Sequence, residues 1–180
     1  FKLIFIKPLK DCNEKYLKTL NEEELYLFDK AYSIHDETIE IDKEKDLSLF
    51  DLDNINININ AVVGKNGTGK STIVELLFAI INNISFEKKI SEDIIKIDNL
   101  RVELIFESIK IYKITINDDE IKIFQYTKEN NKYINSTELN ISEFDFDKLF
   151  YTIAVNYSQH SLNSLYMGDW IHSLFHKNDA

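Results

Sequence analysis

A nine-residue stretch rich in glycine and lysine, 64–72, holds the residues of this chain whose types and spacing point most clearly to chemistry. Its residues are Gly64, Lys65, Asn66, Gly67, Thr68, Gly69, Lys70, Ser71 and Thr72. The spacing matches the phosphate-binding loop G-x-x-x-x-G-K-[ST], known as Walker A. Three of the chain's four glycines lie inside this stretch. The pattern therefore predicts that a phosphorylated ligand, above all a nucleoside triphosphate, binds here.

Each residue type in the stretch has a physical role. Backbone N–H groups around a concave loop donate to phosphate oxygens, and glycine at the turning points accepts the positive φ values that such a loop requires. We predict that Lys70 holds the β- and γ-phosphates and that the Ser71 hydroxyl ligates Mg²⁺. A helix beginning near Gly69 adds the dipole of its N-terminus. ATP and Mg²⁺ are the expected cofactors, and Lys70 is a candidate catalytic residue.

The segments on either side of the loop have the patterns of a strand and a helix. Residues 55–60 alternate Ile with Asn, and 61–63 then run apolar into Gly64, which is typical of a strand. Residues 73–81 are apolar nearly all round, and such a helix is expected to be buried, here between sheet layers. We expect it to stop at the Asn pair 82–83.

The rest of the chain is expected to supply further strands. Residues 13–30 are predicted to be helical or loop-like, 161–176 have helical spacing, and the remaining strong patterns alternate with a period of two. The expected strands are 1–7 ended by Pro8, a hairpin of 32–35 and 38–41, an antiparallel meander within 100–123, and 150–157.

Composition and charge restrict the class of protein. With 44% hydrophobic and 29% charged residues, the 180 residues predict one soluble globular domain, 1–180. A single cysteine excludes an internal disulfide and indicates a cytoplasmic location. No apolar run is long enough to cross a membrane. A net charge of −10 with one arginine does not support DNA binding, although a local basic patch would permit it.

The order of these elements resembles the N-terminal lobe of the ABC-type ATPases, especially the soluble branch that includes SMC, RecF and OLD-like proteins. A strand and a hairpin precede the loop, a meander follows the loop helix, and a strand then ends in Ser158 and Gln159. The resemblance implies an α/β P-loop NTPase fold with a central sheet and an antiparallel β-meander. It also implies that Gln159 contacts Mg²⁺ and the attacking water, as a catalytic and metal-binding residue. The alternative is that Gln159 is simply a polar residue leaving a strand.

The same resemblance carries an expected function. Such ATPases dimerise around two nucleotides, so we expect a homodimer or a partner ATPase subunit, with ATP binding and hydrolysis coupled to dimerisation or to control of an effector. No Walker B strand and no signature motif follow the loop, and we expect both in a second lobe outside this chain. Residues 157–179 also resemble uncharacterised bacterial AAA/ABC-type ATP-binding proteins, some of them associated with phage defence.

Three other classes stay open at this point. A nucleotide-gated scaffold would hold ATP without turnover. A small-molecule kinase would need an arginine-rich lid, and the single Arg101 argues against it. The run 177–179 partly matches the guanine-selecting motif of GTPases, but His176 stands in place of its asparagine and the chain has no Asp-x-x-Gly.

Overall fold

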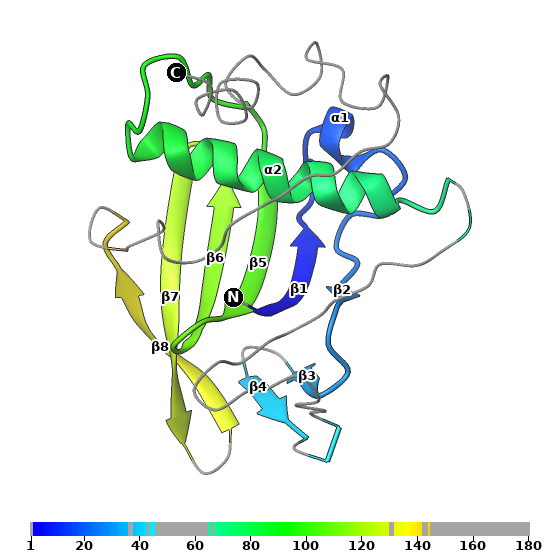
Figure 1. The fold of residues 1–180 in the computed structure, drawn as a ribbon, viewed down its shortest axis with the longest axis vertical. Helices are drawn as coiled ribbons and strands as arrows, with labels where there is room; N and C mark the ends of the chain where they lie inside the picture. Colours follow the sequence, from blue (N-terminus) through cyan, green and yellow to red (C-terminus); the bar gives the residue numbers. More distant parts are fainter. Residues whose placement is uncertain are drawn as a thin grey trace, which may run out of the picture.

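The computed structural model describes residues 2–35, 38–42, 44–45, 65, 67–129, 132–141 and 144 of the chain. Within these residues the chain forms eight strands and two helices (Figure 1). In chain order they are β1 (Lys2–Pro8), α1 (Glu14–Leu17), β2 (Tyr26–Leu27), β3 (Tyr32–His35), β4 (Thr38–Ile41), α2 (Lys70–Glu87), β5 (Arg101–Glu107), β6 (Ile111–Asn117), β7 (Glu120–Glu129) and β8 (Lys132–Leu139).

The eight strands form one curled sheet in the order β2-β1-β5-β6-β7-β8-β4-β3 (Figure 1). Every pair of neighbouring strands in it is antiparallel. The described part of the molecule is therefore mostly β. The expected fold class, an α/β P-loop NTPase resembling an ABC-type N-terminal lobe, is wrong for this structure.

The lengths of the connections explain the antiparallel sheet. A three-residue turn, 108–110, joins β5 to β6 and is closed by the Ser108 N–H donating to the Lys110 carbonyl at 2.9 Å. Asp118, at φ 57°, begins the two-residue turn from β6 to β7. Turns this short can join only antiparallel strands, because a parallel pair needs a crossover of a dozen residues or more. The strands expected at 55–63 and 150–157 lie outside the described residues.

Several of the predicted elements are confirmed. The first strand is β1, with Pro8 as its last residue, and the predicted hairpin is β3–β4. The meander is β5, β6 and β7. Strand β8 was not predicted, because few of its residues are apolar. It forms because its backbone pairs with β7 along one edge and with β4 along the other.

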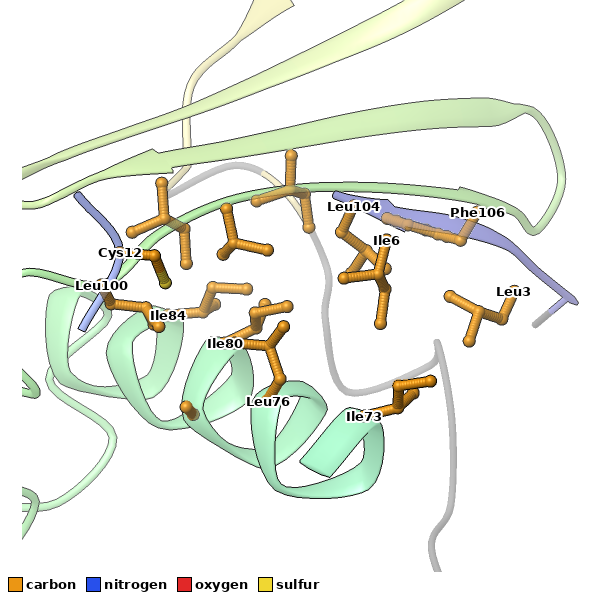
Figure 2. Close-up of a cluster of buried hydrophobic side chains, with 14 of the residues drawn as sticks. Leu3, Ile6, Cys12, Ile73, Leu76, Ile80, Ile84, Leu100, Leu104 and Phe106 are labelled. Carbon is orange, nitrogen blue, oxygen red and sulfur yellow. The ribbon is translucent and has the colours of Figure 1, made fainter. Parts of the chain in front are cut away.

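Helix α2 packs across one face of the sheet and forms the main core with it (Figures 1 and 2). Leu76 and Ile80 are almost fully buried, and they point from the helix toward the sheet residues Leu104 and Phe106 (Figure 2). Among the described residues the helix is covered on one face only, since Val74 on the opposite face is 45% exposed. The expectation that the helix lies between sheet layers is therefore not borne out in the described part.

The helix also runs further than the sequence predicted. It ends at Glu87, and the Asn pair expected to stop it lies inside. Both asparagines are buried and have partners in the next segment of chain. Asn82 donates to the Ile95 carbonyl at 2.8 Å, and Asn83 donates to the Ile97 carbonyl at 2.8 Å. Asparagine usually favours a helix end because its side chain hydrogen-bonds to nearby backbone groups. Here both side chains bond to the segment after the helix, so the helix continues past them.

The opposite face of the sheet carries a second, smaller core beneath the β3–β4 hairpin. Ile39 and Tyr32 of the hairpin pack on Ile105, whose side chain points away from α2 because it alternates with Leu104. The Tyr32 hydroxyl donates to Glu107 at 2.6 Å, at the end of β5. Because this hairpin is itself one edge of the sheet, the curled sheet packs against its own face opposite α2.

Candidate phosphate-binding site

The predicted phosphate loop leads directly into the N-terminus of α2. Gly67 and Gly69 both have positive φ, 83° and 87°, as the motif requires. Between them, Thr68 closes a turn, because its hydroxyl donates to the Lys65 carbonyl at 2.8 Å and its N–H donates to the same oxygen at 3.4 Å. The loop residues in the described part therefore form a compact turn ending at Gly69.

Lys70 bends back over this turn. Its ammonium donates to the Lys65 carbonyl at 2.6 Å, five residues earlier. This contact places a positive charge on the loop itself and not out in solvent beside the helix. An anion bound in the loop would meet that charge without a large rearrangement, and a charge-assisted hydrogen bond to a phosphate is stronger than one to a neutral carbonyl.

The end of the helix is suited to an anion. Gly69 caps α2 without a side-chain hydrogen bond, and the first N–H to bond within this turn is that of Ile73, to the Gly69 carbonyl at 3.0 Å. The N–H groups of the residues before Ile73 have no partner inside the helix, and the helix dipole adds partial positive charge at the same end. The helix has 18 residues, so this effect is fully developed.

The two hydroxyls that follow Lys70 have different surroundings. Ser71 is exposed, whereas Thr72 is only 6% exposed. Only the Ser71 hydroxyl is therefore placed to ligate a metal ion from the side chain. Mg²⁺ prefers oxygen ligands and often keeps several waters while binding substrate phosphates, so one exposed hydroxyl beside a phosphate loop fits that ion. The described residues contain no cluster of three or more His, Cys, Asp or Glu that could hold a metal.

A segment from the beginning of the chain forms a wall against the loop. A Cβ added to Gly69 would lie 2.9 Å from Leu20 Cδ2 and 3.1 Å from the Thr19 hydroxyl. Glycine at this position is therefore required by space as well as by φ. The chain reaches the loop at residues 18–20 directly after α1, and Leu20 is buried in the main core.

An ion pair joins the same segment to α2. Lys18 Nζ contacts a Glu75 carboxylate oxygen, and both side chains are exposed by more than a third. Tyr16 lies near this pair. Burial raises the pKa of its hydroxyl above the ordinary value, and the charge of Glu75 raises that pKa further. Lys18 and Glu75 therefore add one positive and one negative charge to those of Lys65 and Lys70 near the start of α2.

The structure places some of the predicted site residues and not others. Gly67, Thr68, Gly69, Lys70 and Ser71 are brought together with Lys65 at the start of α2. Gly64, Asn66 and Gln159 lie outside the described residues. Sequence analysis did not assign Lys18, Thr19 or Leu20 to the site, because nothing in their spacing links them to a loop some fifty residues later.

Comparison with known proteins gives no further assignment. No family model, curated protein or solved structure matches the chain. In the part of the chain that the structure describes, no helix is both long enough and apolar enough to cross a membrane.

Proposed function

We propose that this chain binds the phosphates of a Mg²⁺-bound nucleoside triphosphate, ATP, at the loop that precedes α2. One observation carries the proposal. The motif glycines Gly67 and Gly69 have positive φ at the start of an 18-residue helix, and the side chain of the motif lysine, Lys70, lies on the same loop. The proposal rests on this local geometry and on the motif, and it does not require a parallel sheet, which the described residues do not form.

Each residue of the loop has a defined task in this proposal. Backbone N–H groups of the first turn of α2 bind phosphate oxygens, and Lys70 moves from the Lys65 carbonyl to the β- and γ-phosphates. Ser71 would hold the Mg²⁺, whose charge would neutralise part of the charge of the phosphates when both are bound. The choice of ATP over other triphosphates follows the resemblance of the sequence to ABC-type ATPases.

We favour a role in which ATP binding controls assembly over one in which ATP is hydrolysed rapidly. In-line attack by water needs a group that orients or deprotonates that water. The carboxylate that follows the loop on α2, Glu75, is paired with Lys18. We propose that ATP binding regulates association with a second copy, a partner ATPase subunit or an effector, and that any turnover uses groups beyond the described residues.

A binding measurement with one substitution tests the proposal. Lys70→Ala should weaken ATP binding roughly 10- to 100-fold, because it removes a charge-assisted hydrogen bond to the phosphates. Isothermal titration calorimetry with Mg²⁺ and ATP measures this effect. Lys110→Ala, an exposed lysine of the β5–β6 turn, removes the same charge far from the loop and should leave the affinity unchanged. Failure of the wild-type chain to bind ATP would end the proposal.

Phosphate release separates the two possible outputs. Wild-type chain that binds ATP but releases no phosphate over hours is a nucleotide-gated module. Steady release that Lys70→Ala abolishes shows an ATPase. Light scattering of the same samples with and without ATP then shows whether the nucleotide changes the assembly state.

A further inference from the structure

We infer that Lys18 is a second cation of the phosphate loop, directed at the terminal phosphate, and that Glu75 competes with the nucleotide for it. This inference rests on the proposed function, since it names a further residue of that same site. It concerns a residue that lies far from the motif in sequence and reaches the loop only through the fold.

Lys18 lies close to the phosphate loop. Thr19 and Leu20 are so close to Gly69 that a single Cβ there would collide with Leu20. Lys18 is the residue immediately before this contact. Its backbone is therefore beside the loop, and a lysine side chain is long enough to extend several ångströms across it.

The Lys18 side chain extends toward α2. Lys18 pairs with Glu75, which follows Ser71 by four residues on α2. Residues four apart share one face of a helix and are about 6 Å apart along its axis. The Lys18 ammonium therefore lies on the Ser71 side of the helix start. Ser71 would hold the Mg²⁺ that accompanies the terminal phosphates of the nucleotide, so the terminal phosphate would lie on this side of the helix.

The backbone of Lys18 has an unfavourable conformation. It ends α1 with φ 46° and ψ −102°, and its N–H donates to the Glu14 carbonyl at 3.0 Å. Positive φ is unfavourable for a residue with a Cβ and persists only where surrounding contacts enforce it. Here it turns the chain sharply, so that the two following residues pack on the loop and the Lys18 side chain extends over α2.

The Glu75 carboxylate and a bound nucleotide would compete for the Lys18 ammonium. The Lys18 and Glu75 side chains are 42% and 36% exposed, so the pair is weakly held and the lysine can change partner. A triphosphate carries more negative charge than a single carboxylate. Lys18 therefore moves to the nucleotide when one is bound, and Glu75 sets the affinity by opposing that move.

Titration of the full 180-residue chain with ATP and with ADP tests this inference. Lys18→Met keeps the aliphatic stem and should weaken ATP binding about ten-fold, because a charged hydrogen bond is lost. The affinity for ADP, which lacks the terminal phosphate, should change by less than about two-fold. Lys18→Arg should recover most of the ATP affinity. Lys15→Met, which removes the same charge from α1, should leave both affinities unchanged.

A second pair of variants separates contact from general charge. Glu75→Gln should tighten ATP binding about three-fold, since it removes the competitor for Lys18 and the value of such an exposed pair is small. Adding Lys18→Met to Glu75→Gln should then weaken ATP binding about ten-fold relative to Glu75→Gln alone. That comparison isolates Lys18 in a background that has no ion pair. The titrations should be run at 0.15 M salt, where more distant charges are screened.

The outcomes are distinguishable. If the double variant binds ATP as tightly as Glu75→Gln, Lys18 does not contact the nucleotide and the inference is wrong, while the proposed function stands. If Lys18→Met weakens ATP and ADP equally, Lys18 does not face the terminal phosphate, and the inference is again wrong. If wild-type chain binds neither nucleotide, both the inference and the proposed function fail. Thermal unfolding of each variant confirms that the binding changes are not changes in folding.

Discussion

Gly67 and Gly69 have nearly the same backbone conformation but different surroundings. Their φ values are 83° and 87°, and a Cβ at Gly67 would meet nothing within 4 Å, whereas one at Gly69 would meet Leu20 at 2.9 Å. The two positions therefore separate the cost of positive φ from the cost of a steric clash.

Alanine at these two positions should lower stability by different amounts. Gly67→Ala should reduce the free energy of unfolding by about 1 kcal/mol, the cost of positive φ for a residue with a Cβ. Gly69→Ala should reduce it by about 2–3 kcal/mol, because the new Cβ also displaces Leu20 from the core. Urea unfolding measures both values. Equal losses would show that residues 18–20 do not pack against the loop.

The motif itself could be predicted at the residue scale, and the wall beside it could not. Positive φ at Gly67 and Gly69 was expected because only a glycine-rich loop turns its N–H groups inward, and both values are confirmed. The contact of Thr19 and Leu20 with Gly69 depends on the path of α1 over the sheet. No periodicity or spacing along the chain encodes such a contact.

At the scale of elements, α2 shows how tertiary bonds override a local preference. Asparagine disfavours helix interiors because its side chain competes for the backbone, and this led to the wrong prediction that the helix stops at Asn82. In the structure, the Asn83 side chain accepts the Ile97 N–H at 2.9 Å and donates to the Ile97 carbonyl at 2.8 Å. The segment after the helix thereby satisfies the amide group, and the helix continues.

Removing the Asn83 side-chain amide should lower the stability of the fold. Asn83→Ala should lower the free energy of unfolding by about 2–3 kcal/mol, because Asn83 is 1% exposed and its removal leaves both backbone groups of Ile97 without these partners. Glu87→Ala, at an exposed position of the same helix, should change stability by less than about 0.5 kcal/mol. Chemical denaturation followed by circular dichroism provides the comparison. A loss below 1 kcal/mol for Asn83→Ala would contradict this account.

At the scale of the whole molecule, the hydrophobic alternation predicted the strands but not their sheet. The alternating side chains of β5, β6 and β7 indicate the face that α2 covers, but not the second core on the opposite face. The short turns between these strands allow only antiparallel pairing. The resemblance to α/β proteins rested on the loop and on a general order of elements. Neither contains the pairing of β1 with β5, or of β4 with β8, which joins segments distant in sequence.

The main core should give the molecule a characteristic loss of stability at alkaline pH. Cys12 is 3% exposed within the main core, and burial raises the pKa of its thiol above the ordinary value of 9.0. The unfolded chain therefore loses this proton at a lower pH than the folded chain does. The free energy of unfolding should fall as pH rises from about 9 toward the higher folded pKa, and below that range Cys12 should have no effect.

The contribution of Cys12 can be isolated by comparing slopes. Cys12→Ala should be less stable at every pH because it leaves a small cavity, but its stability should fall less steeply than that of the wild type between pH 8.5 and pH 10.5. Tyrosines titrate in both proteins and cancel in the comparison. Parallel pH profiles for the two proteins would show that the Cys12 thiol titrates alike in the folded and unfolded states.

Helix α2 is fixed to the rest of the molecule at the end opposite the phosphate loop as well. There Lys88 donates to the Phe144 carbonyl at 2.6 Å, and the Phe144 ring stacks edge-on against Tyr112 at 4.9 Å. A helix of 18 residues is about 27 Å long and behaves as a stiff rod. A ligand that tilted the loop end by about 10° would therefore shift the far end by roughly 5 Å. Such a displacement would act on the Lys88–Phe144 hydrogen bond and, through the Phe144 ring, on Tyr112 of β6.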